Sequence, residues 1–172
     1  MKKLTKSIVS LALIVVMLVC FCGTAFAVST PWSSFPNQQT TSFTTHTYAV
    51  QAYLYNYSDE TNSLIRNAGG IDGYFGSGTY SAVVAFQGAE DLEEDGIVGP
   101  NTWNAMWDKL YKYFSTTTYT DYYVRNYVSD DYGNSYLYSS AKAIRRVSTA
   151  VQGAVVNVWY AFNGNNMIYF AN

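Results

Sequence analysis

The feature that most constrains this chain is a short internal repeat. Residues 72–82 (Asp-Gly-Tyr-Phe-Gly-Ser-Gly-Thr-Tyr-Ser-Ala) align with residues 95–105 (Asp-Gly-Ile-Val-Gly-Pro-Asn-Thr-Trp-Asn-Ala), 23 positions later. The aspartate, two glycines, the threonine and the last alanine are identical in the two copies. Each copy predicts a tight Asp-Gly turn, an apolar pair that can enter a core, a glycine, and the start of a helix. The repeat therefore predicts a compact helical unit with two similar loops.

Apolar spacing around these loops predicts three helices. Thr47 is placed to cap the first and Ser77 the second, and Pro100 suits the first turn of the third. The residues that define the three helices are Val50, Gln51 and Leu54; Thr79, Ala82, Val83 and Phe86; and Trp103, Met106, Trp107 and Leu110. The stretch from Ser58 to Gly70 is rich in Asn, Asp and Gly and predicts a loop.

After Leu110 the pattern changes to one that is typical of strands. Eleven of the 17 tyrosines lie in the last 62 residues. Strands are predicted over 119–128, 135–139, 155–162 and 167–170, with a hairpin turn at 163–166. The tyrosines of 119–128 form two alternating sets, and either one set is an exposed aromatic face or both are covered. The predicted fold class is α+β, with a three-helix domain over 47–110 and a small β-rich unit over 111–172.

Residues 1–27 predict a secretory signal peptide. Three lysines precede an apolar run over 8–22, and Ala25-Phe26-Ala27 is a small-x-small cleavage site. The apolar run is too short for a membrane anchor. We expect cleavage after Ala27, a secreted or cell-wall location, a bacterial source, and no membrane association of the mature chain.

Residues 28–46 are rich in Ser, Thr, Pro, Asn and Gln and have no apolar period. This composition predicts a flexible linker. Three aromatic residues in it, Trp32, Phe35 and Phe43, leave a second possibility open, which is packing onto the helical domain.

Removal of the leader limits the catalytic and metal-binding groups that the mature chain can have. Both cysteines, Cys20 and Cys22, leave with it, so the mature chain has no disulfide and no thiolate. One histidine, His46, cannot supply a zinc hydrolase with its ligands, and we expect neither a metal nor a cofactor. Lys and Arg are too sparse for a nucleic-acid partner, because twelve acidic residues face seven basic ones.

The distribution of carboxylates argues against catalysis. A glycosidase needs two carboxylates in different environments. Outside the helical domain the sequence offers only Asp121, Asp130 and Asp131, and the last two are typical of a turn. We therefore predict no catalytic residue. The acidic run over 90–95 is interpreted as a solvated face.

Three motifs of the helical region agree in order and spacing with one known family. They read Val50-Gln51-x-x-Leu54; Asp72-Gly73-Tyr74-Phe75-Gly76-x-x-Thr79-x-x-Ala82-Val83-x-x-Phe86-Gln87; and Leu92-x-x-Asp95-Gly96-Ile97-Val98-Gly99-Pro100-x-Thr102-Trp103. Over about residues 47–110 the chain resembles the peptidoglycan-binding-domain-1 family. The resemblance implies a three-helix domain that docks exported bacterial proteins on peptidoglycan. Residues 145–158 resemble bacterial SH3-like wall modules only weakly.

Four residues are candidates for ligand contacts in the helical domain: Asp72, Tyr74, Gln87 and Trp103. Polar sugars and peptides are held by aromatic faces and a few hydrogen-bonding groups in a shallow cleft. Each candidate also has a structural interpretation. Asp72 can fix its turn, Gln87 can satisfy buried backbone groups, and Trp103 can belong to the core.

These observations predict a non-catalytic, exported protein that binds peptidoglycan, with the β-rich unit contacting the wall or a protein partner. Two linked weak sites hold a polymer better than one. Two alternatives stay open. One is a cell-wall hydrolase, or an accessory of one, of unrecognised type. The other is a structural or adhesive surface protein that uses the helical domain as a scaffold.

Overall fold

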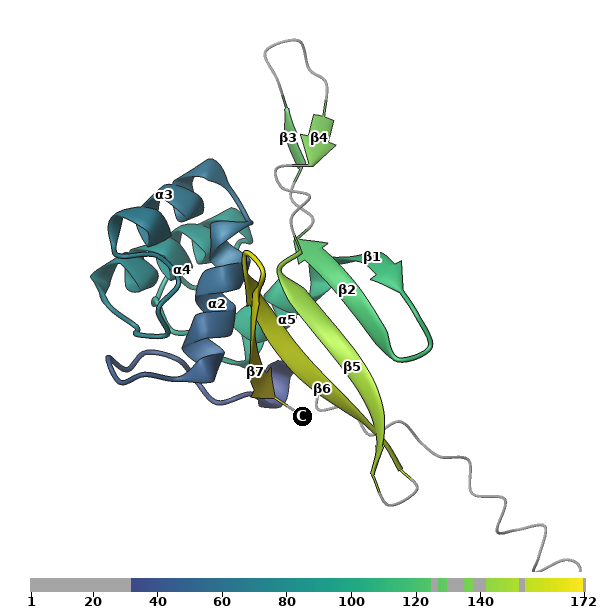
Figure 1. The fold of residues 1–172 in the computed structure, drawn as a ribbon. Coiled ribbons are helices and arrows are strands. Elements are labelled where there is room, and N and C mark those ends of the chain that lie inside the picture. Colours follow the sequence, from purple (N-terminus) through teal and green to yellow (C-terminus); the bar gives the residue numbers. More distant parts are fainter. Residues whose placement is uncertain (1–31, 125–126, 130–134, 138–141, 152–153, 172) are drawn as a thin grey trace, which may run out of the picture.

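The computed structural model describes residues 32–124, 127–129, 135–137, 142–151 and 154–171. Predictions for the signal peptide, its cysteines, Asp130 and Asp131 fall outside these residues. Helices make up the first half of the described chain and an antiparallel sheet the second (Figure 1). This arrangement confirms the predicted α+β class.

The helical half begins with a short 3-10 turn, η1 (Trp32–Ser34). It continues with α2 (Thr45–Tyr55), α3 (Asp59–Asn67), α4 (Ser77–Ala89) and α5 (Pro100–Asp108). Helices α4 and α5 follow the second conserved glycine of each repeat, as predicted. The caps differ from the prediction. Thr44 caps α2, accepting a hydrogen bond from the backbone N–H of Thr47 at 2.8 Å, and Gly76 precedes α4 as its N-cap.

Helix α3 lies where the sequence predicted a loop, so the prediction of three helices was wrong. The described residues contain four α-helices. Ser58 and Thr61 form a capping box, in which each side chain bonds the other residue's backbone N–H. The Thr61 hydroxyl also donates to the carbonyl of Leu54 at 2.6 Å, and Ile65 is fully buried. Because only two residues of α3 are aliphatic, its polar composition hid the helical pattern.

The second half forms a five-stranded antiparallel sheet in the order β1-β2-β5-β6-β7. Its strands are β1 (Leu110–Ser115), β2 (Tyr119–Val124), β5 (Ile144–Val151), β6 (Ala154–Asn163) and β7 (Asn166–Ala171). Two short strands, β3 (Tyr127–Ser129) and β4 (Ser135–Leu137), pair with each other apart from this sheet. The strand predicted over 119–128 is therefore two strands in different sheets, and β1 and β5 were not predicted.

The last hairpin agrees closely with its sequence signal. Strands β6 and β7 pair up to Asn163 and Asn166, which leaves Gly164 and Asn165 as the turn. Gly164 has a φ of +58°, a backbone conformation that glycine adopts without strain.

Strand β2 is covered on both faces. Tyr122 and Tyr123 point to opposite faces, and each is only 8% exposed. The Tyr122 ring lies near Trp159, and the Tyr123 ring lies 5.1 Å from that of Tyr111. Of the two possibilities left open by the sequence, coverage of both faces holds for this strand. Exposed aromatic residues of the sheet lie instead on β1, at positions 111, 113 and 114, and on β7, at position 169.

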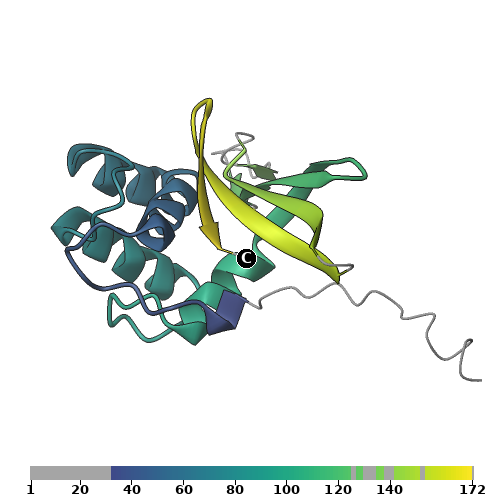
Figure 2. The ribbon, with the colours of Figure 1, turned by 60° about the horizontal axis from the view of Figure 1, so that its bottom comes forward.

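The helices and the sheet share one aromatic core. The ring centroid of Trp32 lies 5.7 Å from those of both Trp103 in α5 and Trp159 in β6, and 6.1 Å from that of Phe170 in β7. Figure 2 shows η1 beside α5 and the end of β7. Phe35 is buried against the same rings. The structure thus differs from the predicted flexible linker, because burial of these two aromatic side chains offsets the entropy lost by ordering the segment.

Helix α2 lies at the centre of the molecule. Its residues 47–54 are all buried, which is unusual for a surface helix and typical of one that is covered on every side. It packs on α3 and α4 along one side and on β6 and β7 along the other (Figures 1 and 2). Side chains of α2 can therefore reach both the repeat loops and the sheet.

Candidate functional site

The first repeat loop is built around the amide of Gln51, which is buried in α2. Its Nε2 donates to Asp72 Oδ1 (2.8 Å), to the carbonyl of Tyr74 (3.1 Å) and to Thr79 Oγ1 (3.0 Å). Its Oε1 accepts from the backbone N–H groups of Asp72 (3.0 Å) and Gly73 (2.7 Å). One side chain therefore fixes both the turn and the start of α4.

The second loop repeats this arrangement around Gln87 of α4. Its Nε2 donates to Asp95 Oδ1 (2.8 Å), to the carbonyl of Ile97 (3.0 Å) and to Thr102 Oγ1 (3.2 Å). Its Oε1 accepts from the backbone N–H of Gly96 at 2.8 Å. The sequence repeat is thus a repeat of hydrogen-bond geometry, in which a buried glutamine of one helix holds the loop that starts the next.

The four predicted ligand contacts occupy different environments. Gln87 and Trp103 are each 1% exposed, and Trp103 packs against Trp32 and Phe35. Asp72 holds its own turn, because its carboxylate accepts from the backbone N–H of Tyr74 at 2.9 Å. Tyr74 is 52% exposed. Of the four, only Asp72 and Tyr74 lie together at the surface, and the binding role of all four stays a prediction.

Each repeat loop borders a small hollow at the start of the following helix. The first hollow has a volume of about 190 Å³ and the second about 240 Å³. The N-caps of α4 and α5, Gly76 and Gly99, carry no side chain that could cover the first amides of these helices. Asp72, Tyr74 and Thr79 line the first hollow. The first hollow is therefore polar, with an exposed aromatic ring at its side.

Residues 37–44, which we name the N-terminal strap, cross both repeat loops. Gln38 and Val98 exchange two backbone hydrogen bonds of 3.2 and 3.1 Å. The N–H of Thr44 donates to the carbonyl of Gly73 at 2.9 Å. Phe43 forms a bridge with Tyr74. The sequence left packing of this segment onto the helical domain open but did not predict the strap, because pairing between segments so far apart leaves no local pattern.

The strap brings a second aromatic ring to the first hollow. Phe43 is 50% exposed, and its ring centroid lies 5.6 Å from that of Tyr74. Gly73 between them has a φ of +82°, and a side-chain carbon there would lie 2.5 Å from the Phe43 ring. The glycine of the Asp-Gly turn is therefore needed both for its backbone conformation and for the close approach of this ring.

A larger cleft, of about 560 Å³, lies between the helical half and the sheet. The helical half contributes Tyr55, Asn56 and Ile71 to its lining. The sheet half contributes Tyr113, Lys142, Phe162 and the hairpin turn 163–165. At its rim the side-chain amide of Asn163 donates to the carbonyl of Ile71 at 3.5 Å.

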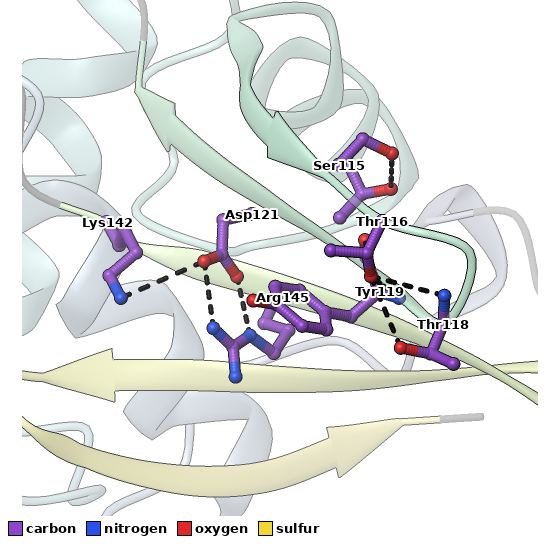
Figure 3. A network of polar contacts seen from close by, with 8 residues as sticks. Ser115, Thr116, Thr118, Tyr119, Asp121, Lys142 and Arg145 are labelled. Atoms are coloured by element: carbon purple, nitrogen blue, oxygen red, sulfur yellow. Dashed lines mark hydrogen bonds and ion pairs between the residues drawn. The ribbon is translucent and has the colours of Figure 1, made fainter.

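Beside this cleft, Asp121 of β2 is buried and bound by two cations (Figure 3). Arg145 of β5 holds both carboxylate oxygens, with Nε–Oδ1 and Nη2–Oδ2 distances of 2.5 and 2.8 Å. Lys142 Nζ lies 3.8 Å from Oδ2. The guanidinium also stacks on the Tyr119 ring. Its hydrogen bonds to Asp121 raise the pKa of Arg145.

His46, at the start of α2, has aromatic neighbours. Its ring centroid lies 5.4 Å from that of Phe35 and 6.0 Å from that of Phe170. Burial lowers the pKa of His46 below its ordinary value. Among the described residues no group of three His, Cys, Asp or Glu side chains is arranged to hold a metal ion. No helix in the same part of the chain has the length and apolar character of a membrane span.

The depressed pKa of His46 predicts a loss of stability in acid. Below about pH 6.5 the unfolded chain takes up a proton on this histidine that the folded chain resists, so the free energy of unfolding falls as the pH falls. We expect wild-type protein to lose more stability between pH 7.5 and 5 than His46→Phe, in which an aromatic ring is kept. Urea unfolding of both proteins at the two pH values measures the difference. Equal losses would contradict the assignment to His46.

Comparison with known proteins finds a similarity in the helical half. Residues 46–106 match the family model described as a putative peptidoglycan binding domain. A protein of Kitasatospora aureofaciens, described as an uncharacterized protein in the bpoA1 3' region, is 47% identical over 55 residues, which are 32% of this chain and 42% of that protein. The chain thus spans less than half the length of this curated relative. No solved structure matches significantly. The repeat loops, the two buried glutamines and most of the helices that they join thus lie in the segment that matches the putative peptidoglycan binding domain.

Proposed function

We propose that this protein is exported and binds peptidoglycan without modifying it. The match of residues 46–106 to a peptidoglycan-binding family supports the ligand class. The leader-like sequence of residues 1–27 supports export to the cell surface.

The observation that carries the proposal is the exposed aromatic pair beside the first hollow. Phe43 and Tyr74 are each about half exposed, although large aromatic side chains normally lie inside. They stand next to a polar hollow lined by Asp72, Ser77 and Thr79. Aromatic rings with a few adjacent polar groups suit a glycan, because a sugar ring presents apolar faces and hydroxyl edges. The second loop has the same frame but Ile97 in place of Tyr74, so the first hollow is the better candidate.

The surroundings of the titratable groups favour binding over hydrolysis. Both oxygens of Asp121 are bonded by Arg145, and this residue is 3% exposed. A carboxylate held in this way is poorly placed to donate a proton or to approach a sugar. The ring of His46 contacts other aromatic rings. These features support a non-catalytic function for the described residues.

Tyr74→Ala tests the proposed surface. We expect the wild-type chain to pellet saturably with purified, protein-free sacculi, and Tyr74→Ala to bind roughly tenfold more weakly, which corresponds to about 1.4 kcal/mol. The half-exposed ring contributes contact area for the ligand and little to the core, so stability should change by less than about 1 kcal/mol. Co-sedimentation over a range of sacculus concentrations measures the affinity.

The matched control is Tyr80→Ala. Tyr80 of α4 is 48% exposed and lies on Gly96 of the second loop, away from the first hollow. It should leave pelleting unchanged. Folded wild-type protein that stays in the supernatant would overturn the proposed function and favour the alternative of a scaffold for a protein partner. Release of soluble muropeptides from the sacculi would instead favour a hydrolase.

A further inference from the structure

We propose that the cleft between the helices and the sheet is a second binding site, and that it takes an N-acetylated sugar bearing a carboxylate, with Lys142 as the counter-ion. The site is distinct from the first hollow, because the two share no lining residue. The residues that line the cleft indicate the chemical class of the ligand. The assignment of this ligand to the cell wall rests on the proposed function.

The charge of the site comes from Lys142. The single negative charge of Asp121 is already bound by Arg145 through two hydrogen bonds (Figure 3). Lys142 Nζ lies 3.8 Å from Oδ2, so it forms an ion pair with Asp121 but lies beyond hydrogen-bond distance. The three groups therefore carry a net charge of +1, and Lys142 is the charged residue that lines the cleft. A cation in such a cleft attracts an anion more strongly than one on an open surface.

Phe162 fixes the position of this charge. Its ring is 7% exposed, and Lys142 Nζ lies 5.1 Å from the ring centroid. A lysine held over an aromatic face loses less conformational freedom when an anion binds. The lysine side chain is 41% exposed, so its ammonium can still be reached by a ligand.

The remaining lining suits a sugar with an amide substituent. Tyr113 is 59% exposed and offers a ring face, and Tyr55 lies across the cleft on α2. Asn163 and Asn165 stand exposed at the hairpin turn, where their side-chain amides can both donate to and accept from an acetamido group. The long contact of 3.5 Å between Asn163 and Ile71 is readily exchanged for a ligand. The cleft volume lies in the range typical of small-molecule sites.

Titration of the ¹⁵N-labelled full chain, expressed with its leader and processed by a bacterial host, tests the proposal. The probes are N-acetylmuramic acid, its neutral counterpart N-acetylglucosamine, and the dipeptide alanyl-alanine as a carboxylate without a sugar. We expect saturable shifts of the side-chain amides of Asn163 and Asn165 with N-acetylmuramic acid. We expect at least tenfold weaker binding of the two other probes.

The variants separate this site from the first hollow. Lys142→Gln should weaken the binding of N-acetylmuramic acid at least tenfold, and Arg66→Gln, which removes an exposed positive charge outside the cleft, should leave it unchanged. Tyr74→Ala should also leave it unchanged. The proposal would be overturned if N-acetylglucosamine or alanyl-alanine bound as tightly as N-acetylmuramic acid. It would also be overturned if Lys142→Gln bound N-acetylmuramic acid as tightly as the wild type. If the protein does not pellet with sacculi but still binds N-acetylmuramic acid in the titration, the proposed function is wrong and this second site still stands.

Discussion

Replacement of Trp32 by alanine is expected to lower the free energy of unfolding by about 3–5 kcal/mol. The indole is 4% exposed and lies between α5 on one side and β6 and β7 on the other. Its removal leaves a cavity at the junction of the helices and the sheet, lined by large rings that cannot collapse into it. Urea unfolding followed by circular dichroism measures the change.

Two variants check this interpretation. Phe43→Ala removes an aromatic ring from the same N-terminal segment, but from an exposed position. It should cost less than about 1 kcal/mol. Trp32→Phe should lower the free energy of unfolding by less than Trp32→Ala, because phenylalanine keeps part of the buried ring area. It also removes a buried indole N–H for which the described residues provide no acceptor. A loss below about 1 kcal/mol for Trp32→Ala would show that the segment is a loose linker after all.

Replacement of Gln51 by leucine is expected to lower the free energy of unfolding by about 3–5 kcal/mol. The side chains are similar in size, so the cost comes from hydrogen bonds rather than from a cavity. Leucine leaves the N–H groups of Asp72 and Gly73, the carbonyl of Tyr74 and the hydroxyl of Thr79 without their shared partner. Each buried group that loses its partner costs about 1–3 kcal/mol, reduced where water can enter.

The same substitution at Gln39 is the control, because that residue is exposed. Gln39→Leu should change stability by less than about 0.5 kcal/mol. Gln51→Leu should also weaken sacculus binding, since it loosens the loop that carries Tyr74. A stable Gln51→Leu variant would show that water replaces the amide at little cost and that the loop does not depend on it.

Local signals account for what the sequence could predict of the fold. The starts of α4 and α5 follow from the repeated glycines, and the β6–β7 hairpin follows from Asn163 to Asn166. Helix α3 was missed because its stability comes from the Ser58–Thr61 capping box and from one buried residue, Ile65, rather than from an apolar stripe. The order of the strands was not predictable, since pairing of β2 with β5 joins residues more than twenty positions apart.

The candidate sites also combine residues that local sequence signals could indicate with residues that only the tertiary structure brings together. Tyr74 could be singled out because it is an aromatic residue beside polar ones, a combination that suits a sugar or a peptide. For its neighbour Phe43 the sequence left packing onto the helical domain open, but it could not predict that Phe43 crosses the first repeat loop and meets Tyr74. The large cleft combines residues from α2, β1 and the β6–β7 turn, together with Lys142 just before β5. No sequence window contains such a site, because it exists only once the helices and the sheet have packed together.

The contact of Trp32 with Trp159 and Phe170 also bears on how this polypeptide is made. A chain is synthesised from its N-terminus, so Trp32 emerges long before the two strands that cover it. Until then the tryptophan has only part of its final surroundings, and the loop that must close spans most of the described residues. The tertiary structure is therefore completed late, after nearly the whole chain is available. For an exported protein, as proposed here, this topology delays completion of the fold until nearly the whole chain has been synthesised.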